Sequence, residues 1–356
     1  MRTSLPWGVV GWVLVVVVAV AGAVVVGTSL GDGNAEVSGP EVAGPEPTDA
    51  GTTMAPTADV RPSDAPASAP SPADVPSPDP ADDPGHATLT RLRPSVATAP
   101  DDKPRVYDDG CHATFEATTA RPCTYGDRSG TRVVVALGDS LMAQWFSAID
   151  GAARTGGWRL VWLTKSGCPA HDASVTSKGR YYQACDTWRS NALAEIRGLP
   201  RVDLLVIGGS ANASLLQRGS MQPVEPDDWS AAWRNGADRV ARGVRGQVRR
   251  LAIMRDTPAF SFDVPDCLQA RNGSTGSCSR APRSVLSARA WSAEQSVDAA
   301  YSWVRATELT AHLCSDRCRP VTSNHVLRYR DRHHLTDTYV RAMTPALHTR
   351  LSWLMR

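Results

Sequence analysis

Two short segments carry residues that could act as a nucleophile and its base. Leu137-Gly-Asp-Ser140 follows an apolar run, and Asp331-Arg-His-His334 lies near the other end of the chain. A serine hydroxyl becomes a good nucleophile when a histidine takes its proton and a third group orients that histidine. The spacing of Asp331 and His334 lets one loop present both side chains. These residues predict a triad with Ser140 as nucleophile, His334 as base and Asp331 as the orienting carboxylate.

Each segment also has a simpler interpretation, which the sequence leaves open. Asp139 and Ser140 are residue types that cap helix N-termini well, so they could serve a helix alone. Asp331 could likewise be a cap, with His333 and His334 as solvated loop residues. Position favours chemistry, because both segments are predicted to lie at the same edge of one sheet.

The elements that must bring these residues together are short apolar strands that alternate with amphipathic helices. Apolar, β-branched runs predict buried strands at 132–137, 159–163, 203–207, 251–254 and 325–329. Apolar spacing of three and four residues predicts helices at 142–154, 186–197, 228–244, 292–309 and 336–354. This alternation predicts an α/β fold whose parallel sheet is covered by helices on both faces. In such sheets the ligand crevice lies beyond the carboxyl ends of the strands, where Ser140 and His334 are expected.

Gly138-Asp-Ser140 near the start and Asp331-x-x-His334 near the end resemble the first and last blocks of the SGNH (GDSL-type) hydrolases. That family implies a three-layer α/β/α, flavodoxin-like fold and two middle blocks that supply a Gly and an Asn as oxyanion donors. On this resemblance, Gly167 and Asn212 would join the backbone N–H of Ser140 in an oxyanion hole. Ser210 and Ala213 depart from the family's Gly and final Asp, and Asn212 could also be an ordinary turn residue.

A wider set of short motifs resembles the SGNH domain attached to membrane O-acyltransferases that decorate bacterial surface polysaccharides. The motifs are Gly138-Asp-Ser-Leu-Met-Ala-Gln-Trp145, Leu163-Thr-Lys-Ser-Gly-Cys-Pro169, Cys185-Asp-Thr-Trp188, Arg255-Asp-Thr-Pro258, Cys267-Leu, Cys314 with Cys318, and Asp331-Arg-His-His-Leu-Thr336. Together they cover about residues 105–355. Leu141 stands where that group often has His, and the many-helix acyltransferase part is not found in this chain. The resemblance therefore implies that a separate polytopic membrane acyltransferase delivers the acyl group.

The resemblance implies two-step acyl transfer through an acyl-Ser140 intermediate, with acetyl as the group transferred and no cofactor. Transfer to a sugar hydroxyl gives an O-acetyltransferase, and transfer to water gives an O-acetyl esterase, acting on cell-envelope polysaccharide or peptidoglycan. The sequence does not choose between them, because both use the same triad. A secreted carboxylesterase or lipase and a non-catalytic glycan-binding scaffold are alternatives. Trp229 and Trp233, one helical turn apart, are either core residues or a sugar platform.

The region before the predicted domain indicates export. Residues 6–26 carry no charged side chain, a length that can cross a bilayer, and Arg2 precedes them. The positive-inside rule then places the N-terminus in the cytoplasm and the rest of the chain outside. We expect residues 1–30 to be a single-pass membrane anchor, with signal-peptide cleavage and secretion as the alternative. Residues 31–103 are rich in Pro, Ala and Asp and predict a disordered linker, which leaves 104–356 for the SGNH-type domain.

Eight cysteines follow this export signal as four sequence-near pairs: Cys111/Cys123, Cys168/Cys185, Cys267/Cys278 and Cys314/Cys318. An even number in an exported protein predicts disulfides, and we take neighbour pairing as the working hypothesis, because sequence does not fix connectivity. The rival interpretation is zinc held by Cys314, Cys318, His325, His333 and His334. We expect no metal. The net charge of +2 provides no field to attract nucleic acid, and the chain has no nucleic-acid motif.

Overall fold

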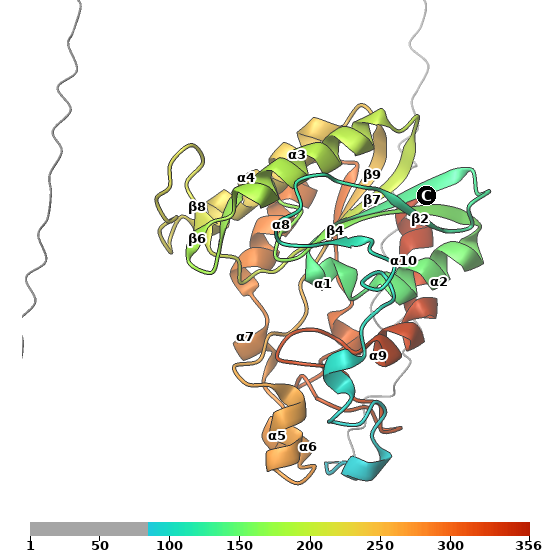
Figure 1. Cartoon of the computed structure of the whole chain (residues 1–356), viewed down its shortest axis with the longest axis vertical. Helices are drawn as coiled ribbons and strands as arrows, with labels where there is room; N and C mark the ends of the chain where they lie inside the picture. The colour runs from blue at the N-terminus through green and yellow to red at the C-terminus, as the bar shows by residue number, and fades with distance from the viewer. Residues whose placement is uncertain (1–84) are drawn as a thin grey trace, which may run out of the picture. The chain divides into compact units, whose positions relative to one another are not determined.

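A mostly parallel sheet organises residues 85–356, the part of the chain that the computed structural model describes (Figure 1). Its strands lie in the order β1-β4-β3-β7-β9-β10, and each neighbouring pair in this order is parallel. Strand β2 pairs antiparallel with β4. The predicted α/β fold with a central parallel sheet is confirmed.

The strands are β1 His112–Ala113, β2 Cys123–Gly126, β3 Arg132–Gly138, β4 Trp158–Lys165, β5 Ser174–Ser177, β6 Arg180–Tyr181, β7 Val202–Ile207, β8 Leu215–Leu216, β9 Val248–Met254 and β10 Val304–Thr307. The α-helices are α1 Ser140–Ala143, α2 Phe146–Gly156, α3 Gln183–Gly198, α4 Trp229–Val244, α5 Val264–Ala270, α6 Thr275–Cys278, α7 Pro282–Val285, α8 Ala288–Ala300, α9 Asp337–Ala342 and α10 Thr344–Leu354. Short 3₁₀ turns lie at Leu89–Arg91, Ala99–Asp101 and Thr310–His312. Strands β6, β5 and β8 form a separate small sheet.

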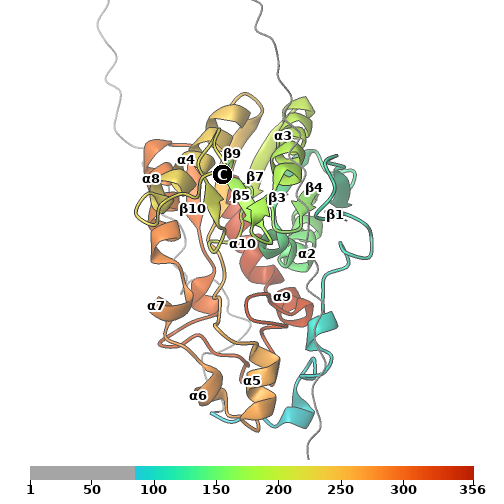
Figure 2. The ribbon, with the colours of Figure 1, turned by 60° about the vertical axis from the view of Figure 1, so that its left-hand side comes forward.

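Helices cover both faces of the main sheet because alternate strand residues point to opposite sides (Figure 2). In β3, Val134 and Ala136 enter one apolar core with residues of α2, α9 and α10. Val133 and Val135 enter a second core with residues of α3, α4 and α8. The sheet is therefore packed against an apolar core on each of its two faces.

The last parallel strand and the last helix differ from the predictions. Strand β10 lies inside the predicted helix 292–309, whose helical part ends with α8 at Ala300. Residues 325–329, predicted as a strand, make only isolated bridges. They belong to an irregular loop whose apolar side chains are buried in the first core. The predicted helix 336–354 is divided at Met343 into α9 and α10. Pro345 explains the break, since proline fits the first turn of a helix but not its interior.

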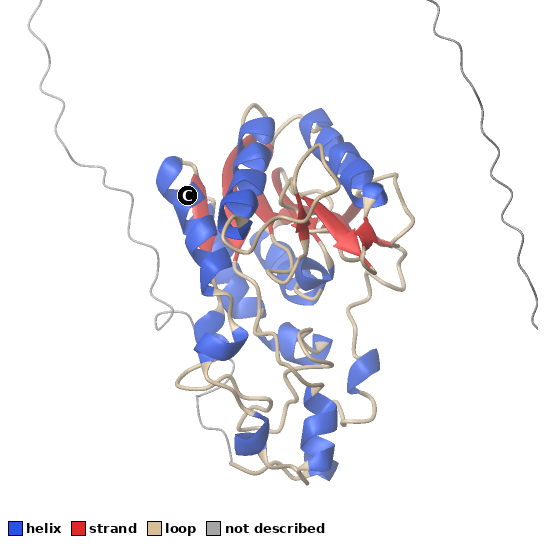
Figure 3. Cartoon of the chain, turned by 90° about the vertical axis from the view of Figure 1, so that its left-hand side faces the viewer, coloured by secondary structure: helices blue, strands red, loops and turns tan. Residues whose placement is uncertain are grey.

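The region around α5, α6 and α7 is built of short helices joined by loops (Figure 3). Disulfides join Cys267 to Cys278 and Cys314 to Cys318 here, and Cys111 to Cys123 and Cys168 to Cys185 elsewhere. The predicted neighbour pairing is confirmed for all four. The zinc alternative is wrong for the two cysteines it requires, because the sulfurs of Cys314 and Cys318 are bonded to each other.

Ordered packing begins earlier than the predicted boundary at residue 104. Leu92 and Ala99 are buried in the first core. Arg93 N donates to His325 O at 3.0 Å, and Leu327 N donates back to Arg93 O at 2.9 Å. The predicted anchor at 1–30 and the predicted linker up to residue 84 lie outside the described residues. From residue 85 onward, no helix combines the length and apolarity needed to cross a membrane.

Candidate active site

Ser140 lies where the central strand β3 meets α1, at the carboxyl edge of the sheet. Asp139 is the N-cap of α1, and its Oδ1 accepts a hydrogen bond from Leu141 N at 2.8 Å. Gly138 allows the turn because a Cβ there would lie 2.5 Å from Gly208 O in the neighbouring loop. Asp139 therefore caps α1, as the simpler interpretation expected. The Ser140 hydroxyl is not used for capping and can make other contacts.

The hydroxyl of Ser140 contacts His334, although the two residues are 194 positions apart in the chain. His334 Nε2 lies 2.9 Å from Ser140 Oγ, and His334 Nδ1 lies 2.7 Å from Asp331 Oδ2. Because an ionised carboxylate only accepts hydrogen bonds, Nδ1 carries the proton donated to Asp331. Nε2 is then free to accept the proton of Ser140. This is the geometry of a nucleophile, a base and an orienting acid.

The carboxylate of Asp331 is held in its ionised form. Burial by itself would raise the pKa of Asp331, but the hydrogen bond and charge of His334 outweigh it and hold this pKa well below its usual range. The second oxygen, Oδ1, accepts from His333 N at 2.8 Å and from His334 N at 2.7 Å. Asp331 therefore fixes both the ring and the backbone of the histidine loop.

A network that the sequence analysis did not identify ties this loop to α1. Gln144 is 1% exposed, and its Oε1 accepts from Leu335 N at 2.7 Å. Its Nε2 donates to Leu141 O at 2.9 Å and to Thr257 Oγ1 at 3.2 Å. Thr257 in turn donates to His333 O at 3.2 Å. Gln144 and Thr257 lie within two of the short motifs quoted above. The sequence did not indicate which residues they contact.

The predicted oxyanion residues lie on the loops that follow β3, β4 and β7. Gly209 packs on Pro169, since a Cβ on Gly209 would lie 2.5 Å from Pro169 Cβ, and Ala170 N donates to Gly208 O at 3.2 Å. Within residues 85–356 the backbone N–H groups of Ser140 and Gly167 have no acceptor. They are thus free to bind an anion.

Asn212 is less firmly placed than the other two predicted donors. It is exposed, and its backbone N donates to Ser210 Oγ at 3.3 Å. No hydrogen bond in the described part of the chain fixes its side-chain amide. The orientation of the Asn212 amide is therefore not fixed by the described residues.

The carboxylates of Asp139 and Asp256 hold the backbone of the loop that carries Asn212. Asp139 Oδ2 accepts from Ser210 N at 2.8 Å, and Asp256 Oδ2 accepts from Ala211 N at 2.9 Å. Burial raises the pKa of Asp139. Burial, together with the charge of Asp139, raises the pKa of Asp256 to about 7 against the opposing hydrogen bond from Ala211. Because both carboxyls are already committed to this loop, Asp256 is a structural group of the site.

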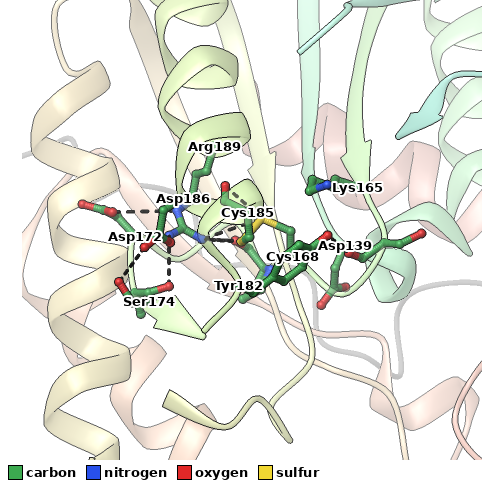
Figure 4. Close-up of a disulfide and its surroundings, with 12 residues drawn as sticks. Asp139, Lys165, Cys168, Asp172, Ser174, Tyr182, Cys185, Asp186 and Arg189 are labelled. Atoms are coloured by element: carbon green, nitrogen blue, oxygen red, sulfur yellow. Dashed lines mark hydrogen bonds and ion pairs between the residues drawn. A yellow bond between two sulfur atoms is a disulfide. The ribbon is translucent and has the colours of Figure 1, made fainter. Parts of the chain in front are cut away.

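The loop after β4 is anchored by the Cys168–Cys185 disulfide and a buried arginine (Figure 4). Arg189 Nη1 donates to Pro169 O at 3.2 Å and lies 3.1 Å from Cys185 Sγ. Its Nη2 donates to Ala173 O at 2.9 Å and to Asp186 Oδ1 at 2.5 Å. The sulfur bridge and the guanidinium group thus join the segment after Gly167 to α3.

The remaining candidate groups do not take part in this arrangement. Asp331, His333 and His334 are close enough to hold a metal ion, but both ring nitrogens of His334 are already hydrogen-bonded. Trp229 and Trp233 are buried and stacked on each other, so they are core residues and not a sugar platform.

An α/β sheet with a hydrogen-bonded Ser–His–Asp chain at its carboxyl edge has the architecture of serine hydrolases. The chain belongs to the family described as the SGNH domain fused to AT3 domains, whose sequence profile matches residues 110–349. The resemblance stated from the sequence is confirmed. Among curated proteins, none matches this chain.

Solved structures similar to this chain include two with named activities. The periplasmic domain of the lipopolysaccharide acetyltransferase of Salmonella ser. Paratyphi A has a TM-score of 0.47 and 13% identity, and the match covers 64% of this chain and 85% of that one. The carbohydrate acetylesterase Est24 of Sinorhizobium meliloti has a TM-score of 0.39 and 12% identity, covering 62% of this chain and 99% of that one.

Proposed function

We propose that this chain is an extracytoplasmic, serine-dependent acyl-transfer enzyme, an O-acetyltransferase or O-acetyl esterase of cell-envelope polysaccharide or peptidoglycan. The observation that carries the proposal is the continuous hydrogen-bonded chain from Asp331 through His334 to Ser140. Membership of a family of SGNH domains fused to AT3 domains supports acyl transfer as the chemistry. An intact triad also argues against the scaffold alternative.

In the proposed mechanism, His334 Nε2 takes the proton of Ser140 as Ser140 Oγ attacks the ester carbonyl carbon. The resulting oxyanion receives hydrogen bonds from the N–H groups of Ser140 and Gly167, with the Asn212 amide as a third donor. One such donor is worth about 3–4 kcal/mol of transition-state stabilisation. The leaving alcohol takes the proton from His334, and an acyl-Ser140 remains. A sugar hydroxyl or water, deprotonated by His334, then removes the acyl group.

The surface supports a short acyl group over a long one. Among residues 85–356, the exposed large apolar side chains are Phe115 and Met221. A lipase needs a broad apolar surface to hold a fatty chain, and two separate side chains do not provide one. We therefore retain acetyl as the transferred group, with a general carboxylesterase as the second candidate.

The disulfides support an oxidising compartment outside the cytoplasm. We propose that residues 1–30 anchor the domain to the membrane as a single pass, with secretion after cleavage as the alternative. We further propose that a polytopic membrane acyltransferase supplies the acyl group, because the family's SGNH domains occur fused to AT3 domains.

The test compares full-length wild type with Ser140→Ala and His334→Ala on a small chromogenic acetyl ester, with mass spectrometry of the peptide that contains Ser140. Ser220→Ala, at an exposed loop serine, is the matched control. We expect turnover in wild type and in the control, and none in the two triad variants. Acyl-Ser140 that forms but is not released to water indicates a transferase. A folded wild type with neither turnover nor acyl-serine would overturn the proposed function.

A further inference from the structure

An exposed aromatic ring lies directly against the loop that carries Gly167. Strand β1 pairs with the end of β4, and Ser166 N donates to Ala113 O at 2.9 Å, so the loops that follow the two strands run side by side. Phe115 follows β1 and is 42% exposed. A Cβ on Gly167 would lie 3.0 Å from Phe115 Cε1, so the ring of Phe115 rests on the backbone of Gly167.

Gly167 has a backbone geometry that allows this contact. Its φ of +60° lies in the left-handed region, which glycine adopts without strain. Any side chain at this position would meet the ring of Phe115. The residue whose N–H we propose as an oxyanion donor therefore lies directly against the exposed ring.

A buried lysine holds Phe115 in place. Lys165 is 0% exposed, and its Nζ donates to Thr114 O at 2.5 Å and to Phe115 O at 2.8 Å. Burial lowers the pKa of Lys165 to about 8. Burying an amine is costly, and here its hydrogen bonds fix the two peptide groups that flank the Phe115 side chain. The ring is thus presented by an ordered segment.

Tyr182 supports the ring from beneath. The ring centres of Phe115 and Tyr182 are 5.7 Å apart and the ring planes are tilted by 38°. Tyr182 is buried, and its hydroxyl donates to Ser166 O at 2.9 Å. Lys165 Nζ lies 5.0 Å from the centre of the Tyr182 ring. Tyr182 is therefore fixed between the two loops, beside Cys168 (Figure 4), and the Phe115 side chain that it contacts stays partly open to solvent.

We propose that Phe115, seated on Tyr182, is a platform for the pyranose ring of the acetylated sugar. This inference rests on the proposed function, because an ester whose carbonyl oxygen binds Gly167 N must place one of its two sides next to Phe115. A single ring is too small for a fatty chain, but it matches the apolar C–H face of a sugar. Polar groups for the sugar hydroxyls come from the residues next in the chain to Gly167 and Phe115, namely the hydroxyl of Ser166, 3.1 Å from His112 Nε2, and the exposed carboxylate of Glu116.

The test measures binding without turnover. Full-length protein with Ser140→Ala is titrated with glucose pentaacetate by calorimetry, alone and combined with Phe115→Ala, Phe115→Leu or Phe115→Trp. Met221→Ala in the same background is the matched control, as the other exposed large apolar residue. We expect binding to weaken about tenfold with Ala and Leu, which corresponds to about 1.4 kcal/mol, and to be retained with Trp and with Met221→Ala.

The outcomes separate this inference from the proposed function. Equal affinity in the Phe115→Ala variant, with its fold verified by circular dichroism, would overturn the platform even if the enzyme turns over esters. An equal loss with Phe115→Trp would also overturn it, because an aromatic face would then not be what matters. If the wild type shows no turnover but sugar binding still depends on Phe115, the platform would be supported and the proposed function would fail.

Discussion

Replacing Gln144 by Leu tests whether the histidine loop depends on α1 for its position. The substitution introduces an apolar side chain of similar size and removes the acceptor of Leu335 N and the donor to Thr257. Leaving one buried N–H without a partner costs about 1–3 kcal/mol. Leu335 is adjacent to His334 in the chain, so the loop relieves this cost by moving, which shifts the imidazole relative to Ser140. We expect kcat to fall about 10- to 100-fold, which corresponds to about 1.4–2.7 kcal/mol of activation free energy.

The assay is steady-state hydrolysis of the acetyl ester at a temperature well below the unfolding midpoint of the variant. We expect KM to change by less than about threefold, because Gln144 would act on the transition state through His334 rather than on ground-state binding. Gln217→Leu, at an exposed position, is the control and should match wild type. A Gln144→Leu variant that is folded and keeps wild-type kcat would show that Asp331 alone positions His334, and would refute the reasoning.

Two further predictions concern single carboxyl groups. Asp331→Asn should lower kcat by about 10⁴-fold, because the amide favours the wrong tautomer of His334. A loss below about tenfold in steady-state assays would contradict the role of Asp331 in the triad. Glu294 is buried, and burial raises its pKa from 4.5 to about 8. Near neutral pH, Glu294 is protonated in the folded chain and ionised in the unfolded chain. The free energy of unfolding is therefore highest, as far as Glu294 is concerned, below about pH 4.5, and it falls as the pH rises to about 8. Glu294→Gln, which keeps an acceptor for Trp233 Nε1, should flatten the decline of the unfolding midpoint across that range; an unchanged slope would count against it.

The sheet, and the meeting of Ser140, His334 and Asp331 at its edge, could be predicted from the sequence because their signals are local. The apolar run before Ser140 predicts its strand, and Asp331 and His334 are three residues apart on one loop. The positions of the proposed oxyanion donors required the family resemblance, and within residues 85–356 no hydrogen bond fixes the side-chain amide of Asn212.

What the sequence could not show depends on contacts between distant segments. Gln144 meets Leu335 across 191 positions, and Lys165 meets Phe115 across 50. The spacing of apolar residues in the sequence does not predict such contacts of polar side chains with distant segments. The predicted strand at 325–329 failed for a related reason, since its apolar residues are buried by an irregular loop rather than by strand pairing.

The early start of ordered packing determines where a protease can cut the chain without disturbing the histidine loop. Asp102 accepts hydrogen bonds from Asp337 N and Thr338 N at the start of α9, the helix that begins just after His334. Arg93 pairs with the loop that leads into Asp331. A protease that cuts before Arg93 would leave these contacts to the histidine loop and to α9 in place. A cut after Asp102, although it spares the whole segment that matches the family, would remove them and leave His334 less ordered.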